Sequence, residues 1–458
     1  MKILVALSST FNLIYLANLL EELKDRGHEV VVHARKTYKT KSLIFQSDFY
    51  EFERKNRENY NLIEFDNYWS VNYLKKICIK GLRALKSYAV YLNPKHTSQW
   101  RIEGVKKRMR GTGLARIAYN SVFDSILKIK SVLKIIDFIE SIIPPDKTIS
   151  DIVKNIRPDV VISAPFIFHE DFEIEYAKTA KKLRIKTVVP LLSWDFLSTK
   201  YTFPFYPDKI LVWNHDILRE AVDIHYVPRE IIEITGATRF DKWFSLRPKM
   251  PRQDFLTKLG IPDNHKYLVY LCSSNNISKD EKDQIIDIQN ILLGEKNICG
   301  LSLVVRPHPL NTLTDVKRLN GNGLAVWPRH RNFPYSDQSI QDYFDTLFHS
   351  EGVIGVNTSA FLESAIVDRP CITLLSDRYE QTQTKMGHFN LLMKQNFIET
   401  ASSTSELKKT VVAVLSGDDR KKGARRSFVK NFLRPQGINR SSSSFTANVI
   451  ENLICAEE

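Results

Sequence analysis

An arginine and a histidine stand at the end of an apolar strand in the second half of the sequence, and both side chains can bind phosphate. The stretch LSLVVRPHP places Arg306 and His308 at and just beyond the end of strand 301–306. In α/β folds ligands bind at the carboxyl ends of the strands, so both side chains should emerge at a binding edge. A guanidinium group presents a fixed fork of N–H donors that matches phosphate oxygens. The motif therefore predicts an anion site.

A second segment, EGVIGVNTSAFLESAIVDRPCITLL at 351–375, predicts a strand, a helix and another strand. Asn357 or Thr358 is a good N-cap, so the first helical turn would offer free N–H groups to a phosphate. Glu363 follows Ser359 by four residues and shares its helical face, where a carboxylate can accept hydrogen bonds from two ribose hydroxyls. The alternative is that Thr358 caps an ordinary helix and Glu363 is a solvated acid. Together with RPHP, the segment favours a nucleotide-phosphate site.

Composition indicates a soluble globular protein of two or three domains. The chain has 458 residues, 43% of them hydrophobic and 26% charged. No apolar run approaches the roughly 18 residues that span a bilayer, and the N-terminus opens as a strand rather than as a signal peptide. Five scattered cysteines lack metal-ligand or redox spacing and read as reduced, buried thiols. We therefore expect a cytoplasmic protein with no bound metal and no cofactor.

Positive charge is concentrated in one region. The formal net charge is +14, and residues 70–135 hold 15 lysines and arginines against two acids. These cations alternate with Leu, Ile, Val, Tyr and Trp, a pattern typical of a basic amphipathic surface on anionic lipid. The alternatives are nucleic acid, for which the chain offers no recognised module, and a solvated basic face. We expect peripheral contact with the inner face of a cell membrane and no nucleic acid partner.

The first half of the chain predicts a doubly wound parallel sheet. An opening strand at 2–7, a helix at 12–26 and a strand at 29–34 form its first βαβ unit. The loop 8–12 at the end of the first strand lacks GxGxxG, so a dinucleotide fingerprint is absent. Residues 36–145 interrupt the alternation and are predicted to be a basic, mainly helical insertion. Later strands are expected at 158–164, 186–192, 208–213 and 231–235.

The second half predicts another α/β domain. A polar, proline-containing run near 244–264 reads as an interdomain connection, and strands resume at 266–274. We therefore divide the chain into a first Rossmann-like domain, 1–245, and a second, 265–430. A C-terminal tail, 431–458, should end in a helix that packs back on the first domain.

The sequence resembles bacterial GT-B glycosyltransferases of surface polysaccharide synthesis. The similar groups are the capsule/Kdo-transferases, the bacterial sialyltransferases and the CDP-glycerol glycerophosphotransferases. The matching stretches are RPHP (306–309), GVNTSAFLESAIVDRPCI (355–372), SWDFLSTK (193–200), FYPDKILVWN (205–214) and TGATRFD (235–241). This resemblance implies two Rossmann-like domains facing a cleft, with an acceptor in the first and a nucleotide-sugar donor in the second. The implied activity is transfer of a sugar to a surface glycan or glycolipid, as in capsule or lipopolysaccharide synthesis.

The resemblance also implies roles for individual residues. His308, as the histidine of the HP motif, would contact the nucleotide phosphate and stabilise the leaving group, with Arg306 as a second cation. Thr358 and Ser359 would contact phosphate, and Glu363 would bind the ribose. Another pair, Ser273 and Ser274 after the first strand of the second half, would reach the phosphate from the other side. The nucleotide could be CMP-, CDP- or UDP-linked.

Transfer to an acceptor hydroxyl also needs a general base, which an inverting enzyme would carry in the first domain. The acids that follow strands there include Asp171, after strand 158–164, and Asp195, after strand 186–192. Asp171 could instead be a helix N-cap, Asp195 could be a turn residue, and His169 could be the base. No acid pair at metal-ligand spacing stands out, so we expect a metal-independent reaction.

Three other functions remain open on sequence. A non-hydrolysing UDP-sugar 2-epimerase would share the two-domain fold, and the TG…D stretch at 235–241 echoes it. Transfer of phosphoglycerol would place His308 against the transferred phosphate itself. A catalytically silent scaffold on a membrane is the third, although such a protein has no use for a phosphate site built from Arg306, His308, Ser359 and Glu363.

Overall fold

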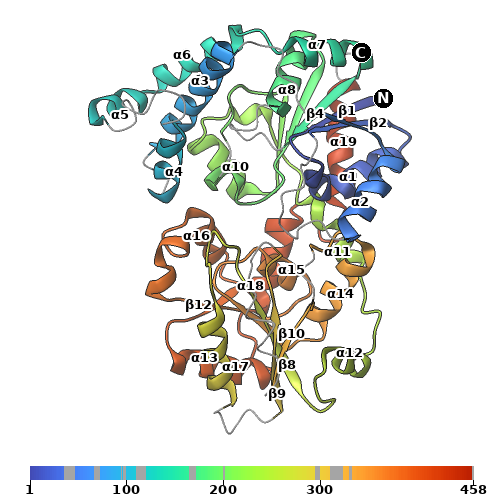
Figure 1. The fold of residues 1–458 in the computed structure, drawn as a ribbon, viewed down its shortest axis with the longest axis vertical. Helices are drawn as coiled ribbons and strands as arrows, with labels where there is room; N and C mark the ends of the chain where they lie inside the picture. The colour runs from blue at the N-terminus through green and yellow to red at the C-terminus, as the bar shows by residue number, and fades with distance from the viewer. Residues whose placement is uncertain are drawn as a thin grey trace. The chain divides into compact units, whose positions relative to one another are not determined.

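The chain folds into two compact units, each built on one parallel sheet (Figure 1). The computed structural model describes residues 1–35, 47–65, 73–93, 95, 99–109, 120–164, 172–199, 202–293, 300–309, 323–329 and 333–455. Unit 1 comprises Met1–Tyr38, Lys55–Asp241 and Phe432–Glu458. Unit 2 comprises Lys39–Arg54 and Lys242–Asn431. Each unit is described by itself.

Unit 1 contains a seven-stranded sheet in the order β3-β2-β1-β4-β5-β6-β7, and every pairing is parallel. Its strands are apolar runs, as expected of strands covered by helices on both faces. All the strands expected from the sequence are present. The bounds are β1 Lys2–Leu7, β2 Glu29–Arg35, β3 Asn61–Phe65, β4 Val160–Ala164, β5 Lys186–Pro190, β6 Lys209–Val212 and β7 Ile232–Ile234.

The helices of unit 1 follow the apolar periodicity of the sequence. In α1, leucines at positions 13, 16, 20 and 23 form one buried stripe. The helices are α1 Leu13–Asp25, α3 Tyr73–Tyr91, α4 Gln99–Met109, α5 Ser121–Leu127, α6 Lys130–Ile142, α7 Lys147–Ile156, α8 Phe172–Lys182, α9 Phe196–Thr199, α10 His215–Asp223 and α19 Ser442–Cys455. The helix α2 Ser47–Asn59 is divided: its residues up to Arg54 belong to unit 2 and the remainder to unit 1. Short 3-10 turns lie at η1 Thr10–Asn12, η4 Arg229–Ile231 and η5 Thr238–Phe240.

The expected insertion at 36–145 requires a correction. Strand β3 lies inside it and pairs in parallel with β2, with Val31 opposite Asn61 and Arg35 opposite Phe65. The doubly wound pattern therefore continues through β3. In the part of the helical region expected at 114–142 that the structure describes, residues 120–142 form two helices, α5 and α6. The helical layer proper is α3–α6, which lies beside α8 and α10 (Figure 1).

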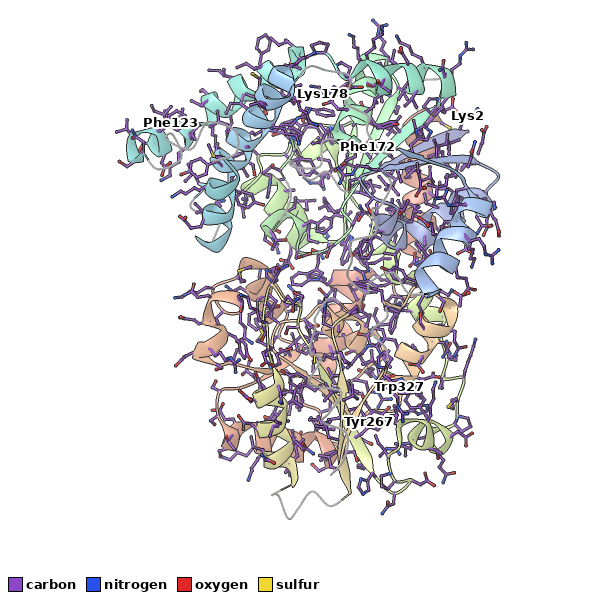
Figure 2. The ribbon with its side chains drawn as sticks, viewed as in Figure 1. Lys2, Phe123, Phe172, Lys178, Tyr267 and Trp327 are labelled. Atoms are coloured by element: carbon purple, nitrogen blue, oxygen red, sulfur yellow. The ribbon has the colours of Figure 1, made fainter. Side chains whose placement is uncertain are left out.

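Buried ion pairs attach this helical layer to α8. Arg83 of α3 donates to Glu140 of α6 at 2.8 Å and to Glu175 of α8 at 2.5 Å, and its side chain is fully buried. Lys178 of α8, labelled in Figure 2, donates to the same Glu140 oxygen at 2.8 Å. Burial alone would raise the pKa of Glu140, but Arg83 and Lys178 outweigh it and the pKa is lowered. The network therefore holds α3 and α6 at a fixed position on α8.

Two cations of the basic region therefore lie inside the unit rather than on a lipid-facing surface. Arg83 is held in the network just described, and Lys86 is buried and paired with Asp137 of α6. Burial lowers the pKa of Lys86, against the opposing charges of Asp137 and Glu140. The sequence pattern counted Arg83 and Lys86 with the exposed cations because their acidic partners lie far along the chain.

The C-terminal segment is anchored in unit 1. The carboxylate of Asp241 accepts hydrogen bonds from the backbone N–H groups of Ser442 and Ser443 at 3.0 and 2.6 Å, at the start of α19. The same carboxylate accepts from Arg434 at 2.7 Å. Gly236 lies against this start with φ +87°, and a Cβ there would be 2.3 Å from Ser442 Oγ. The contact therefore requires glycine at position 236.

Unit 2 contains a six-stranded parallel sheet in the order β10-β9-β8-β11-β12-β13. Its strands are β8 Lys266–Leu271, β9 Leu301–Arg306, β10 Leu324–Val326, β11 Gly352–Gly355, β12 Cys371–Leu374 and β13 Ile398–Ala401. Its helices are α11 Asp241–Ser245, α12 Arg252–Leu259, α13 Lys282–Leu293, α14 Asp337–Phe348, α15 Ala360–Ile366, α16 Gly387–Lys394, α17 Thr404–Leu415 and α18 Lys422–Phe428, with η7 Asp377–Thr382 and the π-helical η8 Val429–Leu433.

The run 244–264, expected as a connection, is partly helical. It contains α12, whose Phe255, Leu256 and Leu259 are buried, and α12 belongs to unit 2. Gly260 ends α12 in the left-handed conformation at φ +73°. The prolines at 248, 251 and 262 are typical of a linker, but Pro251 directly precedes α12, where proline is compatible with the start of a helix.

Two further expectations have an outcome in the structure. Among the described helices, none combines the length and the apolar character needed to cross a bilayer. Cys272 and Cys371 are buried as expected, whereas Cys78 and Cys455 are exposed. The exposed pair lies on the helices α3 and α19, where the apolar-strand argument does not apply.

The docking of α19 can be tested with a matched pair of glycine variants. Gly236→Ala should destabilise unit 1 by about 3 kcal/mol, because it adds a clash with Ser442 and Leu433 to the strain of a positive φ. Gly27→Ala should cost about 1 kcal/mol, because Gly27 has φ +83° but no described atom within 4 Å of the added Cβ. Denaturant unfolding would measure both losses. Equal losses would show that the contact with α19 is not tight.

Candidate functional site

The carboxyl edge of the unit 2 sheet collects the predicted phosphate-binding segments. Strand β8 lies between β9 and β11, and its last residue, Leu271, is opposite both Arg306 and Gly355. Residues that follow these strands therefore leave the sheet at one edge. From β8 the chain continues to β9 and β10 on one side of β8, and it later returns to β11 on the other side. The strand order therefore reverses at β8, and open α/β sheets bind ligands at the carboxyl edge next to such a switch point.

Arg306 is the most distinctive group at this edge. Its Cζ lies 3.8 Å from the ring centroid of Tyr343 on α14, and Trp243 packs edge-on against the same ring at 5.1 Å. The Nη1 atom is buried, and no described residue accepts a hydrogen bond from it. Burial lowers the pKa of Arg306, and electrostatic interactions with Tyr343, Asp342 and, least of the three, Glu363 partly offset this shift. The structure thus holds a desolvated cation on an aromatic platform, where it can bind an anion.

Glu363 is the acid that the sequence predicted for the same site as this cation. It is on α15, which follows β11, and its residue is only 8% exposed. Because Arg306 ends β9, and β9 and β11 flank β8, both residues belong to elements at the carboxyl edge of the unit 2 sheet. The proposed contact of Glu363 with a ribose stays a prediction.

The start of α15 agrees with the expectation only in part. Ser359 precedes the helix, but its backbone is already helical and its side chain makes no capping bond. The Thr358 hydroxyl accepts a hydrogen bond from Ala360 N at 3.3 Å, as a capping residue would. The Asn357 side chain instead donates to Thr382 O at 2.7 Å and lies 3.1 Å from His388 Nε2. Because α15 has only seven residues, we assign no anion site to its N-terminus. Of the two hydroxyl residues, Ser359 is exposed and Thr358 is buried, so Ser359 is the accessible one.

The two serines after β8 also differ from each other. Ser273 is fully buried, and its backbone N–H donates to Glu281 Oε2 at 2.8 Å. Burial raises the pKa of Glu281, while hydrogen bonds from Ser273 lower it. Ser274, the next residue along the chain, is half-buried. Ser274 is therefore the more accessible of the two serines, and contact of either one with a phosphate stays a prediction.

His308 follows Arg306 by two residues at the same edge. Burial lowers the pKa of His308 to about 4, and its ring lies edge-on to Phe333 with centroids 6.4 Å apart. The imidazole is therefore neutral at neutral pH and can donate one N–H hydrogen bond. A bound phosphate would favour the protonated form.

The candidate bases belong to unit 1. The carboxylate of Asp195 accepts hydrogen bonds from Ser193 Oγ at 2.6 Å and Thr199 Oγ1 at 3.2 Å, and its carbonyl accepts from Thr199 N at 3.0 Å. The donors to the carboxylate are hydroxyl groups rather than backbone N–H groups, so these bonds do not decide between the turn role and the catalytic role of Asp195. Asp171 and His169 lie outside the described residues. The catalytic role of Asp195 and Asp171 stays a prediction.

Sequence reasoning missed two residues of interest. Tyr343 sits on an amphipathic helix, where an aromatic residue reads as core, and no local signal predicts its stacking on Arg306. Glu220 of α10 has a buried oxygen, Oε2, that accepts no hydrogen bond from the described residues. Burial, with the charges of Asp195 and Asp216, raises the pKa of Glu220 to about 8. Its acidic neighbour Asp216, four residues earlier, was the one available signal.

Comparison with solved structures identifies the fold as GT-B. The chain is similar to UDP-GlcNAc 2-epimerase from Methanocaldococcus jannaschii, with TM-score 0.52, 13% identity and coverage of 98% of this chain and 99% of that one. It is also similar to a glycosyltransferase from Rickettsia africae, with TM-score 0.53, 10% identity and coverage of 100% and 99%. A third similar structure is UDP-GlcNAc 2-epimerase from Neisseria meningitidis bound to UDP-GlcNAc, with TM-score 0.52, 13% identity and coverage of 99% and 100%. No protein-family model and no curated protein sequence matches the chain.

The protonation of His308 gives a direct test of the site. In the free protein we expect its imidazole to titrate near pH 4, and addition of UDP should raise this pKa because the phosphates stabilise the imidazolium. Protein-detected NMR of the imidazole C–H groups, assigned with His308→Gln, would measure both values. A free-protein pKa near 6.5, or a value that UDP leaves unchanged, would remove His308 from the phosphate site.

Proposed function

We propose that this protein is a GT-B glycosyltransferase that transfers a sugar from a nucleotide-sugar donor to a surface glycan or glycolipid. The observation that carries the proposal is the buried guanidinium of Arg306, stacked on Tyr343 at the switch point of the unit 2 sheet. Two of the similar structures support it: one is a glycosyltransferase, and another is bound to UDP-GlcNAc.

In this proposal each residue at the edge has a separate task. Arg306 and His308 bind the donor phosphates and stabilise the negative charge that develops as the bond between the anomeric carbon and the phosphate oxygen breaks. Ser274 and Ser359 add hydroxyl donors, and Glu363 accepts hydrogen bonds from the ribose. The acceptor hydroxyl attacks the anomeric carbon and gives its proton to a base of unit 1, for which Asp195 and Asp171 remain the candidates. The reaction is inverting and uses no metal.

Two arginines of unit 2 provide a matched test of donor binding. Arg306→Ala should weaken UDP, CDP or CMP binding about 10- to 100-fold, the usual loss for a charge-assisted hydrogen bond to phosphate. Arg369→Ala is the control: Arg369 also has a buried nitrogen and lies 5.3 Å from an aromatic ring, that of Phe348, but it precedes β12 at the opposite edge. It should leave affinity unchanged. Isothermal calorimetry measures the nucleotide affinity of both variants. Equal effects of the two substitutions would contradict the proposal that Arg306 binds the donor phosphates.

A second candidate function is 2-epimerisation of a UDP-sugar, because two of the similar structures are UDP-GlcNAc 2-epimerases that align over nearly their whole length. Transfer of phosphoglycerol from CDP-glycerol is a third, within transferase chemistry. Both would use the phosphate site of Arg306.

An acceptor-free assay separates these candidates. Inverting the configuration at C2 breaks its C–H bond, so an epimerase incubated with UDP-GlcNAc in D₂O should introduce deuterium at C2. We expect no such exchange and no consumption of the sugar nucleotide without an acceptor. Mass spectrometry of the recovered UDP-GlcNAc gives the answer, and rapid deuterium uptake would replace the transferase proposal by the epimerase. Phosphoglycerol transfer is tested in a separate reaction in which CDP-glycerol replaces the nucleotide sugar and an acceptor is added.

A further inference from the structure

Helix α6 carries two apolar stripes, and only one of them packs inside unit 1. Leu133 and Ile136 are buried in the helical layer with α3 and α5. On the other side of the same helix, large apolar side chains recur at positions i, i+3, i+4 and i+7 and are exposed to solvent: Ile135, Phe138, Ile139 and Ile142, of which Phe138 is 64% and Ile142 63% exposed. A surface helix needs one apolar stripe to fold, so the second has another use.

The exposed stripe continues onto the neighbouring helix. Val122 and Ile126, four residues apart on α5, are exposed, and so is Ile129 in the connection to α6. These residues and the α6 stripe form what we call the α5–α6 face. In the view of Figure 2, Phe123 of α5 lies on the side of unit 1 away from Lys2.

Charge is divided unequally across these two helices. Lys128 and Lys134 are exposed beside the apolar stripe, whereas the ammonium group of Lys130 lies 5.1 Å from the ring centroid of Tyr226. The three acids of α5 and α6 are all engaged on the inner side: Asp124 accepts from Tyr88 Oη at 2.6 Å, Asp137 pairs with Lys86, and Glu140 lies in the Arg83 network. Within α5, α6 and their connection, the charged groups beside the exposed apolar side chains are therefore lysines.

We propose that the α5–α6 face binds the surface of an anionic lipid bilayer, with the apolar side chains inserted between the headgroups and the lysines on the lipid phosphates. Apolar stripes flanked by lysine are the pattern of helices that lie in the plane of a membrane interface. α6 has 13 residues and is roughly 20 Å long, too short to cross a hydrocarbon core of about 30 Å. A second copy of the chain is a poorer occupant, because a two-fold contact would place lysines against lysines.

Vesicle binding tests the proposal with exposed residues, whose replacement leaves the core intact. The full-length protein should bind vesicles of phosphatidylcholine mixed with phosphatidylglycerol. The variant Ile135→Ser/Phe138→Ser/Ile142→Ser should lose at least about 10-fold in partitioning. Ile438→Ser, an exposed isoleucine elsewhere in unit 1, is the control and should bind like the wild type. Co-sedimentation with the vesicles measures all three.

A lysine pair tests the electrostatic part. Lys128→Gln/Lys134→Gln should weaken binding to the mixed vesicles roughly 25-fold at low salt, about five-fold for each lysine, and the difference should shrink as salt is added. Lys154→Gln/Lys182→Gln, on the exposed surfaces of α7 and α8, should have little effect.

Three outcomes would overturn the proposal. These are absence of binding to the anionic vesicles, wild-type binding by the triple serine variant, and a concentration-dependent dimer in sedimentation that the triple serine variant abolishes. The last would assign the α5–α6 face to a second copy of the chain. None depends on nucleotide binding, so failure here and failure of the transferase proposal are separable.

Discussion

The strictly parallel pairing of both sheets is the constraint on which the rest of the structure depends. In a parallel sheet every strand delivers its following residues to the same edge, and each connection must cross a face through a helix. The register of unit 2 puts Arg306 and Gly355 opposite Leu271, although the three residues are distant in sequence. The candidate phosphate site therefore follows from topology, which places its residues at one edge of the sheet.

The burial of Arg306 at this edge is unfavourable for folding. Removing a guanidinium from water is unfavourable, and an apolar side chain of similar size would pack on Tyr343 without that penalty. The stacking contact and the charge of Glu363 return only part of the lost solvation, because no described residue accepts a hydrogen bond from Nη1. A cation held in this way gains most when a phosphate binds, since the anion supplies the missing charge and hydrogen bond together. Arg369 has a similar environment, with a buried nitrogen and a neighbouring aromatic ring, but it lies at the opposite edge of the sheet.

The apolar runs of the sequence allowed most strands of both sheets to be predicted. Features that depend on tertiary packing could not be predicted in this way. Strands such as β1 and β8 are continuous apolar stretches, which periodicity detects directly. Strand β3 escaped because NLIEF is short and follows the highly charged helix α2. Arg306 and Glu363 could be singled out because they belong to recognisable motifs, and their roles at a phosphate and a ribose stay predictions. Tyr343 and the contact of Ser273 with Glu281 escaped, since both depend on packing that no local spacing encodes.

The basic region shows most clearly why a count of charges does not define a surface. Arg83 finds its acidic partners 57 and 92 residues further along the chain, and this distant pairing removes it from solvent. The same pairing fixes the rotation of α6, because Glu140 must face α3 and α8. Once that side of the helix is committed, Phe138 and its stripe can only point outward. The buried ion pairs thus determine which apolar residues are exposed, and they convert a diffuse basic segment into a defined apolar face bordered by lysines.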